Sequence, residues 1–338
     1  EESMKRQLQV LVTSLVVVLF ASFSARLYGA DVPLEKILVG VPEVSIAQSP
    51  LFVAIEAGAF KRYGMEVSVV RLPGAQAIQA LVAGATQFAQ GVSSRTVPSA
   101  VLAGADTVMI AGLTNKFIFT MHSLPNIDSV ASLKGKIVGV SGIGASIDFA
   151  TRVALKHFGL KPDSDVAIRA IGGGPEIVSA LKAGIIQAGT LSPPSSFRAE
   201  KMGFKRLFDM GTLDIEYMSA GLGVKRSYMA ANRGRVANFL KGMIEGIKIF
   251  KTDKNFTIPV LAKYTKLTDN ELLEKSYEYF RDYFIQVPYP SIRAIKDTLE
   301  VLAEQIPKAK GASPEDFIDI SLLREIEASG FVEKLYSR

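Results

Sequence analysis

Two short loops of this sequence carry the residue types best suited to hold a small polar molecule. Gly91 to Ser94 reads GVSS, and Thr190 to Ser195 reads TLSPPS. Serine and threonine hydroxyls donate hydrogen bonds, as do backbone N–H groups, so such loops can hold a partial negative charge without a buried counter-charge. Arg95 stands beside the first loop, where it is either an anion ligand or an ordinary surface arginine. The chemistry that these loops indicate is hydrogen-bonded capture of a solute.

Each loop ends one copy of a repeated stretch. Residues 74–94 read GAQAIQALVAGATQFAQGVSS, and residues 174–195 read GPEIVSALKAGIIQAGTLSPPS. A glycine, an Ala-Leu pair, an Ala-Gly pair and a glutamine recur at matching places about 100 residues apart. Each copy predicts a glycine turn, a helix of about ten residues, a glycine that ends the helix in the left-handed conformation, and a short apolar strand.

The similarity extends upstream of these stretches. The strand-like ILVGV at 37–41 is answered by IVGV at 137–140, and FKRYGM at 60–65 by KHFGL at 156–160. Two similar βαβαβ units predict an α/β fold with two lobes, each a mainly parallel sheet flanked by helices. Open sheets of this kind bind ligands beyond the carboxyl ends of their strands, so we expect the two loops to face a common cleft. Apolar residues at helical spacing from position 236 onward predict a helical C-terminal extension.

Two predicted helix starts would close such a site from its sides. A loop that contains Ser45 and Gln48 leads into a helix, for which Ser49 is the expected N-cap. A second loop, GIGAS, contains Gly144 and leads into another helix, for which Ser146 is the expected cap. Because helix N-termini attract anionic groups, both starts are expected to contribute to the binding of a ligand.

The candidate ligand-binding residues come from these loops and helix starts, and from a tyrosine near the second crossing between the lobes. That tyrosine is either a packing residue or a ring that stacks on the ligand. The full set is Ser45, Gln48, Ser49, Gly74, Gln76, Ser93, Ser94, Gly144, Ser146, Thr190, Ser192 and Tyr217. Such a lining suits sulfonate, carboxylate or nitrate groups, and a neutral heterocycle or an aromatic acid is also open.

Catalytic and cofactor motifs are missing from the sequence. The chain has no cysteine, and its two histidines, His122 and His157, have no serine or carboxylate at motif spacing. The GIGAS loop begins like a dinucleotide fingerprint, but Ile147 occupies the third glycine position. No Walker-type phosphate loop and no Gly-x-Ser-x-Gly turn occurs. We therefore expect no enzyme activity, no cofactor and no metal.

Composition sets the broad class of the protein. A chain of 338 residues, 48% of them hydrophobic, is long enough for two domains with a core each. The net charge of +6 comes from scattered residues, which indicates a solubilising surface rather than a nucleic-acid site. We expect a monomer that binds a small molecule and no nucleic acid.

The first 30 residues predict an export signal. A basic pair, Lys5 and Arg6, precedes an apolar run from Leu8 to Phe20, and small residues follow. The run is shorter than the roughly 20 residues of a spanning helix, so a cleaved signal peptide is favoured over a membrane anchor. Cleavage is expected after Ala30 or at the alternative site near residues 22–24. A periplasmic location follows from this prediction.

One segment resembles a known family. Residues 49–67, SPLFVAIEAGAFKRYGMEV, resemble the opening signature of the nitrate/sulfonate/taurine-type solute-binding proteins of ABC importers. That group also includes binders of thiamine pyrimidine precursors. The resemblance implies a two-lobed type II periplasmic-binding-protein fold and an extracytoplasmic protein that captures a small solute by closing its lobes. It also implies that the partners are the permease and ATPase subunits of an ABC transporter.

The resulting domain plan has one discontinuous lobe and one continuous lobe. Residues 1–30 form the signal peptide, residues 31–116 and 216–338 form lobe one, and residues 117–215 form lobe two. Two other functions are open. An enzyme could use the same scaffold, although the related pyrimidine synthases carry a cysteine-rich motif that this chain lacks. The second alternative is a sensor, whose closed form is recognised by a partner other than a permease.

Overall fold

The structure, a computed structural model, describes residues 33–42, 44–72 and 75–337. The predicted signal peptide at residues 1–30 and the candidate residue Gly74 lie outside the described residues. Both sheets and all the described helices belong to one unit, residues 36–338, apart from the first residue of β1.

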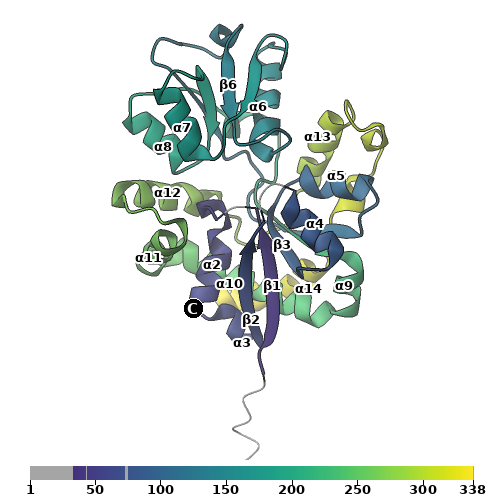
Figure 1. The fold of residues 1–338 in the computed structure, drawn as a ribbon. Helices are drawn as coiled ribbons and strands as arrows, with labels where there is room; N and C mark the ends of the chain where they lie inside the picture. The colour runs from purple at the N-terminus through teal and green to yellow at the C-terminus, as the bar shows by residue number, and fades with distance from the viewer. Residues whose placement is uncertain (1–32, 43, 73–74, 338) are drawn as a thin grey trace, which may run out of the picture. The chain divides into compact units, whose positions relative to one another are not determined.

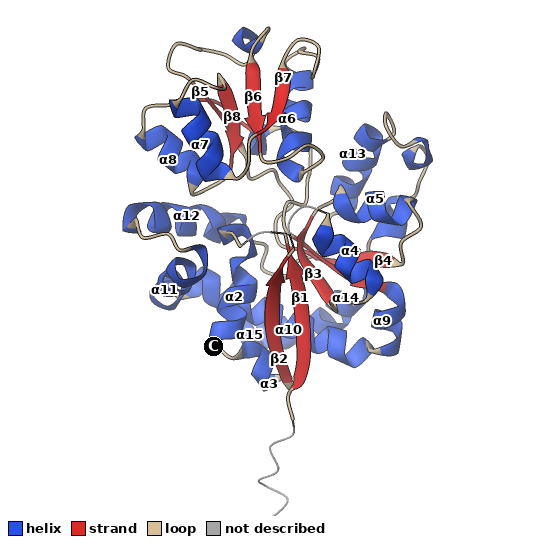
Figure 2. Ribbon diagram, in the orientation of Figure 1, coloured by secondary structure: helices blue, strands red, loops and turns tan. Residues whose placement is uncertain are grey.

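The strands form two separate five-stranded sheets (Figure 2). The first sheet has the order β2-β1-β3-β10-β4, and the second has the order β7-β6-β8-β5-β9. The strands are β1 (Glu35–Val41), β2 (Met65–Arg71), β3 (Phe88–Val92), β4 (Thr107–Gly112), β5 (Thr120–Ser123), β6 (Ile137–Val140), β7 (Ala167–Ala170), β8 (Ala188–Leu191), β9 (Lys205–Asp209) and β10 (Gly221–Lys225).

The helices connect these strands and continue to the C-terminus (Figure 1). Within the described residues, no helix is both long and apolar enough to cross a membrane. The α-helices are α2 (Ser49–Glu56), α3 (Ala59–Arg62), α4 (Gln76–Ala83), α5 (Thr96–Leu102), α6 (Ser146–His157), α7 (Gly174–Lys182), α8 (Ser195–Lys201), α9 (Arg226–Ala231), α10 (Arg233–Thr252), α11 (Lys254–Thr265), α12 (Asn270–Tyr283), α13 (Ile292–Leu302), α14 (Ser321–Ala328) and α15 (Phe331–Tyr336). Short 3-10 helices are η1 (Ile46–Gln48), η2 (Ala131–Leu133), η3 (Met210–Thr212), η4 (Pro307–Ala309) and η5 (Pro314–Phe317).

The two sheets share one strand pattern. In the first sheet β1 pairs with β3 in parallel, and β10 pairs antiparallel with β3 and with β4. In the second sheet β6 pairs in parallel with β7 and β8, and β5 pairs antiparallel with β8 and β9. In each sheet one strand thus runs antiparallel to its two neighbours, β10 in the first sheet and β5 in the second. The predicted α/β fold, with two mainly parallel sheets flanked by helices, is confirmed.

The repeated glutamines have the same structural task in both sheets. The side-chain oxygen of Gln87 accepts a hydrogen bond from the N–H of Leu38 at 2.8 Å, and that of Gln187 accepts from Ile137 at 3.1 Å. The backbone N–H of each glutamine donates to the carbonyl of the same partner residue at 3.0 Å. The glutamine therefore fixes the start of the third strand against the first, which explains its place in the repeat.

Helices cover both faces of each sheet. In the second sheet, Val138 and Val140 of β6 belong to the core that contains α6, whereas Ile137 packs toward the core of α7 and α8. In the first sheet, Phe88 of β3 stacks on Phe239 of α10, with ring centroids 3.9 Å apart. The alternating side chains of each strand thus reach two different helical layers.

The residues just before β5 and β10 lie outside the sheets, because β5 begins at Thr120 and β10 at Gly221. The residues before them pair with each other. The N–H of Leu113 donates to Ala220 at 2.9 Å, and the N–H of Tyr217 donates to Asn115 at 3.2 Å. We call residues 113–119 and 210–220 the crossing segments, because they carry the chain between the two sheets.

The long helix α10 packs on α2 through glycines. A Cβ at Gly246 would lie 2.2 Å from the carbonyl oxygen of Pro50 and 2.8 Å from the Cβ of Ala54. One turn earlier, a Cβ at Gly242 would lie 2.5 Å from the Phe60 ring. The close approach of α10 to α2 therefore depends on the absence of a side chain at Gly246, and Gly242 makes room for Phe60 of α3.

Replacement of Gly246 by alanine should push α10 away from α2, and we expect it to lower the free energy of unfolding by about 1–3 kcal/mol. Gly234→Ala in the same helix is the matched control, because nothing lies within 4 Å of a Cβ there. It should leave stability unchanged or raise it by up to about 1 kcal/mol, through helix propensity alone. Urea unfolding followed by circular dichroism gives both values, and equal effects of the two substitutions would contradict the packing argument.

Candidate functional site

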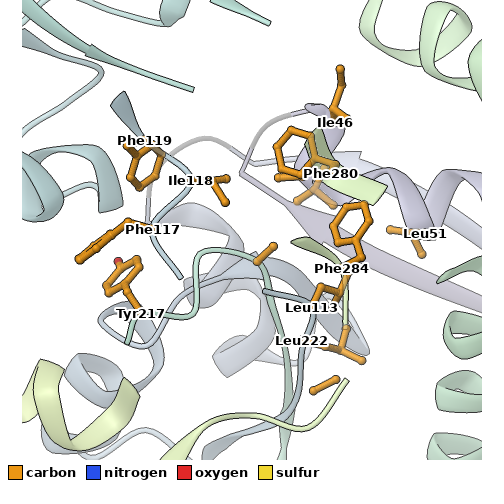
Figure 3. Packing of buried hydrophobic residues seen from close by; sticks show 14 of the residues in the cluster. Ile46, Leu51, Leu113, Phe117, Ile118, Phe119, Tyr217, Leu222, Phe280 and Phe284 are labelled. Atoms are coloured by element: carbon orange, nitrogen blue, oxygen red, sulfur yellow. The ribbon is translucent and has the colours of Figure 1, made fainter. Parts of the chain in front are cut away.

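Tyr217 joins the crossing segments to the first turns of α6. Its side chain is fully buried, and its ring stacks on Phe117 with centroids 4.6 Å apart and on Phe149 with centroids 5.2 Å apart. Figure 3 shows the Tyr217 and Phe117 rings lying against each other. Three aromatic rings from three separate parts of the chain thus form one stack.

The hydroxyl of Tyr217 has no hydrogen-bond partner within the structure. Burial raises the pKa of this hydroxyl, while the nearby hydroxyls of Ser146 and Ser93 and the charge of Arg95 act in the opposite direction. Those two serines are thus its polar neighbours, although neither completes a hydrogen bond to it. A buried hydroxyl without a partner costs about 1–3 kcal/mol, which a hydrogen bond to a ligand would offset. We call Ser93, Arg95, Ser146 and Tyr217 the Tyr217 cluster.

Ser93 lies in a tight turn between β3 and α5. Its N–H donates to the Oγ1 of Thr96 at 2.8 Å, and its Oγ accepts from the N–H groups of Arg95 and Thr96 at 3.3 Å. These bonds hold the serine side chain in place and occupy its acceptor capacity. Its hydroxyl donates to the Oγ1 of Thr96 at 3.4 Å, and it lies among the groups near the Tyr217 hydroxyl.

Ser146 begins α6 instead of capping it. The N-cap is Ala145, without a side-chain hydrogen bond, so the predicted cap at Ser146 is wrong by one position. The turn is held by Asp148 instead, whose carboxylate accepts from the N–H of Gly144 at 2.8 Å and from Arg152 at 2.8 Å. The Ser146 hydroxyl is therefore not used by the helix and lies near Tyr217.

The loop after β1 forms a second polar group. Ser45 donates to the side-chain oxygen of Gln48, which is almost fully buried. A Cβ on Gly91 would lie 2.9 Å from the amide nitrogen of Gln48, so this glycine lets the two loops touch. The predicted cap at Ser49 is also wrong by one position, because η1 runs directly into α2 and Gln48 is the N-cap.

The other candidate residues are engaged elsewhere. The Ser94 hydroxyl shares a hydrogen bond of 2.9 Å with Thr298 of α13, and the Thr190 hydroxyl lies 2.8 Å from that of Thr151 on α6. Gln76 is exposed at the start of α4. Ser192 is half-buried, and its carbonyl accepts from the N–H of Ser196 at 3.1 Å. Of the predicted set, the structure thus brings together Ser93, Ser146 and Tyr217, while Ser45 and Gln48 lie in the loop that touches Gly91.

Sequence reasoning missed the groups that hold the site together. Phe149 and Phe117 stack on Tyr217, and Asp148 fixes the glycine turn. Only Asp148 had a local signal, since it lies four residues before Arg152 on the same helix face. Arg95, which the sequence left open, donates to the carbonyl of Gly144 and lies 5.8 Å from the centre of the Phe149 ring.

The two sheets with a shared strand pattern, joined by paired crossing segments, define the class of periplasmic-binding-protein folds. The structure is similar to the alkanesulfonate-binding protein SsuA from Xanthomonas axonopodis pv. citri bound to MOPS, with a TM-score of 0.72, 19% identity and coverage of 85% of this chain and 98% of that one. SsuA from Escherichia coli gives a TM-score of 0.71 and 21% identity, with coverage of 86% and 99%. The nitrate-binding protein NrtA from Synechocystis PCC 6803 gives 0.71 and 15%, with coverage of 87% and 89%.

The chain belongs to the NMT1/THI5-like family, whose model matches residues 46–253. This match and the structural likenesses confirm the resemblance found in the sequence. A comparison with curated protein sequences gave no match.

Tyr217→Phe in the ligand-free protein tests whether the hydroxyl is structural. Because the hydroxyl is buried without a partner, its removal should leave the free energy of unfolding unchanged or raise it by about 1 kcal/mol. Phe117→Ala removes a ring from the same stack and should cost about 3–5 kcal/mol. Thermal and urea unfolding measure both. If Tyr217→Phe lowers the free energy of unfolding by more than about 1 kcal/mol, the hydroxyl forms a hydrogen bond within the fold.

Proposed function

We propose that this protein is an extracytoplasmic solute-binding protein that captures a small solute and delivers it to an ABC permease. The observation that carries the proposal is the unpartnered hydroxyl of Tyr217, buried beside the crossing segments with two serine hydroxyls near it. A solute with hydrogen-bond acceptors would use all three donors. The likeness to periplasmic binding proteins of alkanesulfonate and nitrate supports the same type of task.

The proposed lobes follow the sheets. Lobe one comprises residues 31–116 and 216–338, and lobe two comprises residues 117–215. The paired crossing segments would act as the hinge, because they are the backbone links between the two sheets. Each lobe contributes a serine to the Tyr217 cluster, Ser93 from one and Ser146 from the other. A solute held by both serines would favour an arrangement that keeps them close, which is the physical basis of capture by closure.

The solute class follows from the donors of the site. Hydroxyl groups donate hydrogen bonds to acceptors, and a sulfonate, carboxylate or nitrate group carries two or three acceptor oxygens on one central atom. A neutral heterocycle offers fewer and gains less from the Arg95 charge. We therefore propose an anionic solute as the first choice and a neutral heterocycle as the second. The predicted signal peptide supports a periplasmic location, and the fold supports partners of the ABC-importer type.

A ligand screen by thermal shift is the direct test. The panel should contain nitrate, sulfonates, carboxylates and pyrimidines, because a ligand at a hundred times its dissociation constant adds about 2.7 kcal/mol of stability. Calorimetry with the best ligand then compares Ser93→Ala, Ser146→Ala and Tyr217→Phe. Each should weaken binding by about 0.5–1.5 kcal/mol for a neutral ligand group and about 1.5–3 kcal/mol for a charged one.

Ser179→Ala, on the exposed face of α7, is the matched control and should bind like the parent protein. Ser192→Ala tests whether the second repeated loop also takes part. Parent-like binding by all three cluster variants would place the site elsewhere in the molecule. The role in transport is tested separately, by uptake of the identified ligand in cells with and without the protein.

A further inference from the structure

Arg95 joins two parts of the chain that follow strands of different sheets. It lies in the turn after β3 of the first sheet, where its backbone N–H donates to the Ser93 hydroxyl at 3.3 Å. Its guanidinium donates to the carbonyl of Gly144, in the loop between β6 and α6 of the second sheet, and lies 5.8 Å from the centre of the Phe149 ring. We call these two side-chain contacts the Arg95 bridge.

The groups that Arg95 contacts are held in place by their own neighbours. Gly144 has a φ of +82°, a left-handed conformation that glycine adopts without strain. Its N–H donates to the carboxylate of Asp148 at 2.8 Å, which fixes the loop before α6. The Phe149 ring stacks on Tyr217 with centroids 5.2 Å apart. The start of α6 therefore presents a fixed carbonyl and a fixed ring face to the guanidinium.

The spacing along the chain links the Arg95 bridge to the Tyr217 cluster. Arg95 lies two residues after Ser93, and Gly144 lies two residues before Ser146. The hydroxyls of both serines lie near the Tyr217 hydroxyl. The hydrogen bond between Arg95 and Gly144 therefore keeps the two serine-bearing turns close to each other.

A second contact of α6 with the first lobe is less suited to this task. Lys156, near the end of α6, pairs with Glu304, which follows α13, at 2.5 Å, and both side chains are exposed. Exposed ion pairs contribute little and weaken with salt. The Arg95 bridge combines a charge-assisted hydrogen bond with a cation held over an aromatic face, and both are stronger interactions.

We infer that Arg95 is a positioning residue: it holds the turn after β3 against the start of α6, and so assembles the three hydroxyls of the Tyr217 cluster before a solute binds. This inference rests on the proposed capture between two lobes and adds the residue that sets their closed arrangement. The charge of Arg95 also favours a nearby anion, but its contacts join the lobes. Loss of the side chain should therefore loosen the lobes without any solute, whereas loss of a simple ligand contact would not.

Distance measurements between two spin labels by electron paramagnetic resonance test the inference without a solute. The chain contains no cysteine, so Lys182→Cys on α7 and Lys296→Cys on α13, both at exposed positions, provide the two labelled sites. The labelled parent should show a short distance between the lobes. Arg95→Gln should add a longer distance and lower the ratio of short to long distances by about tenfold or more, because a hydrogen bond to a charged group is lost.

Gly144→Ala tests the other end of the Arg95 bridge. Alanine is strained at a φ of +82°, so the carbonyl should move away from the guanidinium and the longer distance should appear again. Gly142→Ala in the same loop is the matched control, because its φ is not left-handed and nothing lies within 4 Å of a Cβ there. Arg324→Gln, at an exposed position of α14, controls for the loss of a positive charge. Circular dichroism spectra like that of the parent show that each variant folds.

A solute from the earlier screen then separates positioning from direct contact. Arg95→Gln and Gly144→Ala should each weaken binding by the factor with which the short-distance fraction falls. The double variant should bind no more weakly than the weaker single variant, because both changes break the same bridge. A neutral solute should lose affinity too, which removal of a counter-charge alone would not cause.

Two results would overturn the inference. One is a distance distribution like that of the parent in both Arg95→Gln and Gly144→Ala, and the other is an additive loss of affinity in the double variant. Neither removes the proposed function, because a solute that depends on Ser93, Ser146 and Tyr217 would still establish it. Conversely, longer distances in both variants of a protein that binds no solute of the panel would support the Arg95 bridge while the proposed function fails.

Discussion

The pairing of the two crossing segments is the constraint on which the rest of the molecule depends. Backbone hydrogen bonds join Leu113 to Ala220 and Asn115 to Tyr217, and the Ser219 hydroxyl donates to the carbonyl of Lys116 at 3.2 Å. The same pairing sets the rings of Phe117 and Tyr217 against each other (Figure 3). It therefore decides where each sheet begins, and it places a tyrosine hydroxyl beside the ends of β3 and α6. The site is a consequence of how the chain crosses between the sheets.

This arrangement leaves polar groups unsatisfied where an ordinary core would satisfy them. The Tyr217 hydroxyl and the whole amide of Gln90 in β3 are buried without partners. Each such group costs free energy in the ligand-free protein, and the surrounding aromatic stack must offset that cost. A binding protein gains from this distribution, because a hydrogen bond first made with the ligand contributes fully to affinity. In the proposed role, the stability that Phe117 and Phe149 supply would support a hydroxyl that recognises the ligand.

Much of the fold could be predicted because the sequence contains it twice. The helix-ending glycines, Gly84 and Gly184, both adopt positive φ, at +76° and +69°, and both repeated glutamines bond to the first strand of their sheet. The site was harder to predict, because its geometry comes from contacts between distant segments. Nothing local to Tyr217 shows that Phe117 and Phe149 will enclose it, or that Ser94 will turn toward Thr298 while its neighbour Ser93 does not. The caps at Ser49 and Ser146 were misplaced because a 3-10 turn and an aspartate, respectively, perform the work expected of serine.

The ion pairs between residues 117–215 and the C-terminal part of the chain contribute little to stability. Lys201 of α8 reaches Glu271 of α12 at 2.7 Å, with side chains 53% and 52% exposed, and Lys156 reaches Glu304 with 44% and 59% exposed. Exposed pairs of this type are worth about 0–1 kcal/mol each and weaken with salt. The arrangement of one sheet against the other is therefore not locked by charge. A ligand that contacts Ser93 and Arg95 on one side and Ser146 on the other can shift that arrangement only by its differential affinity, and the weakness of the ion pairs keeps the required difference small. Weak ion pairs between the two sheets, together with the firmly hydrogen-bonded crossing segments, would allow a ligand to change the arrangement of the sheets without unfolding them.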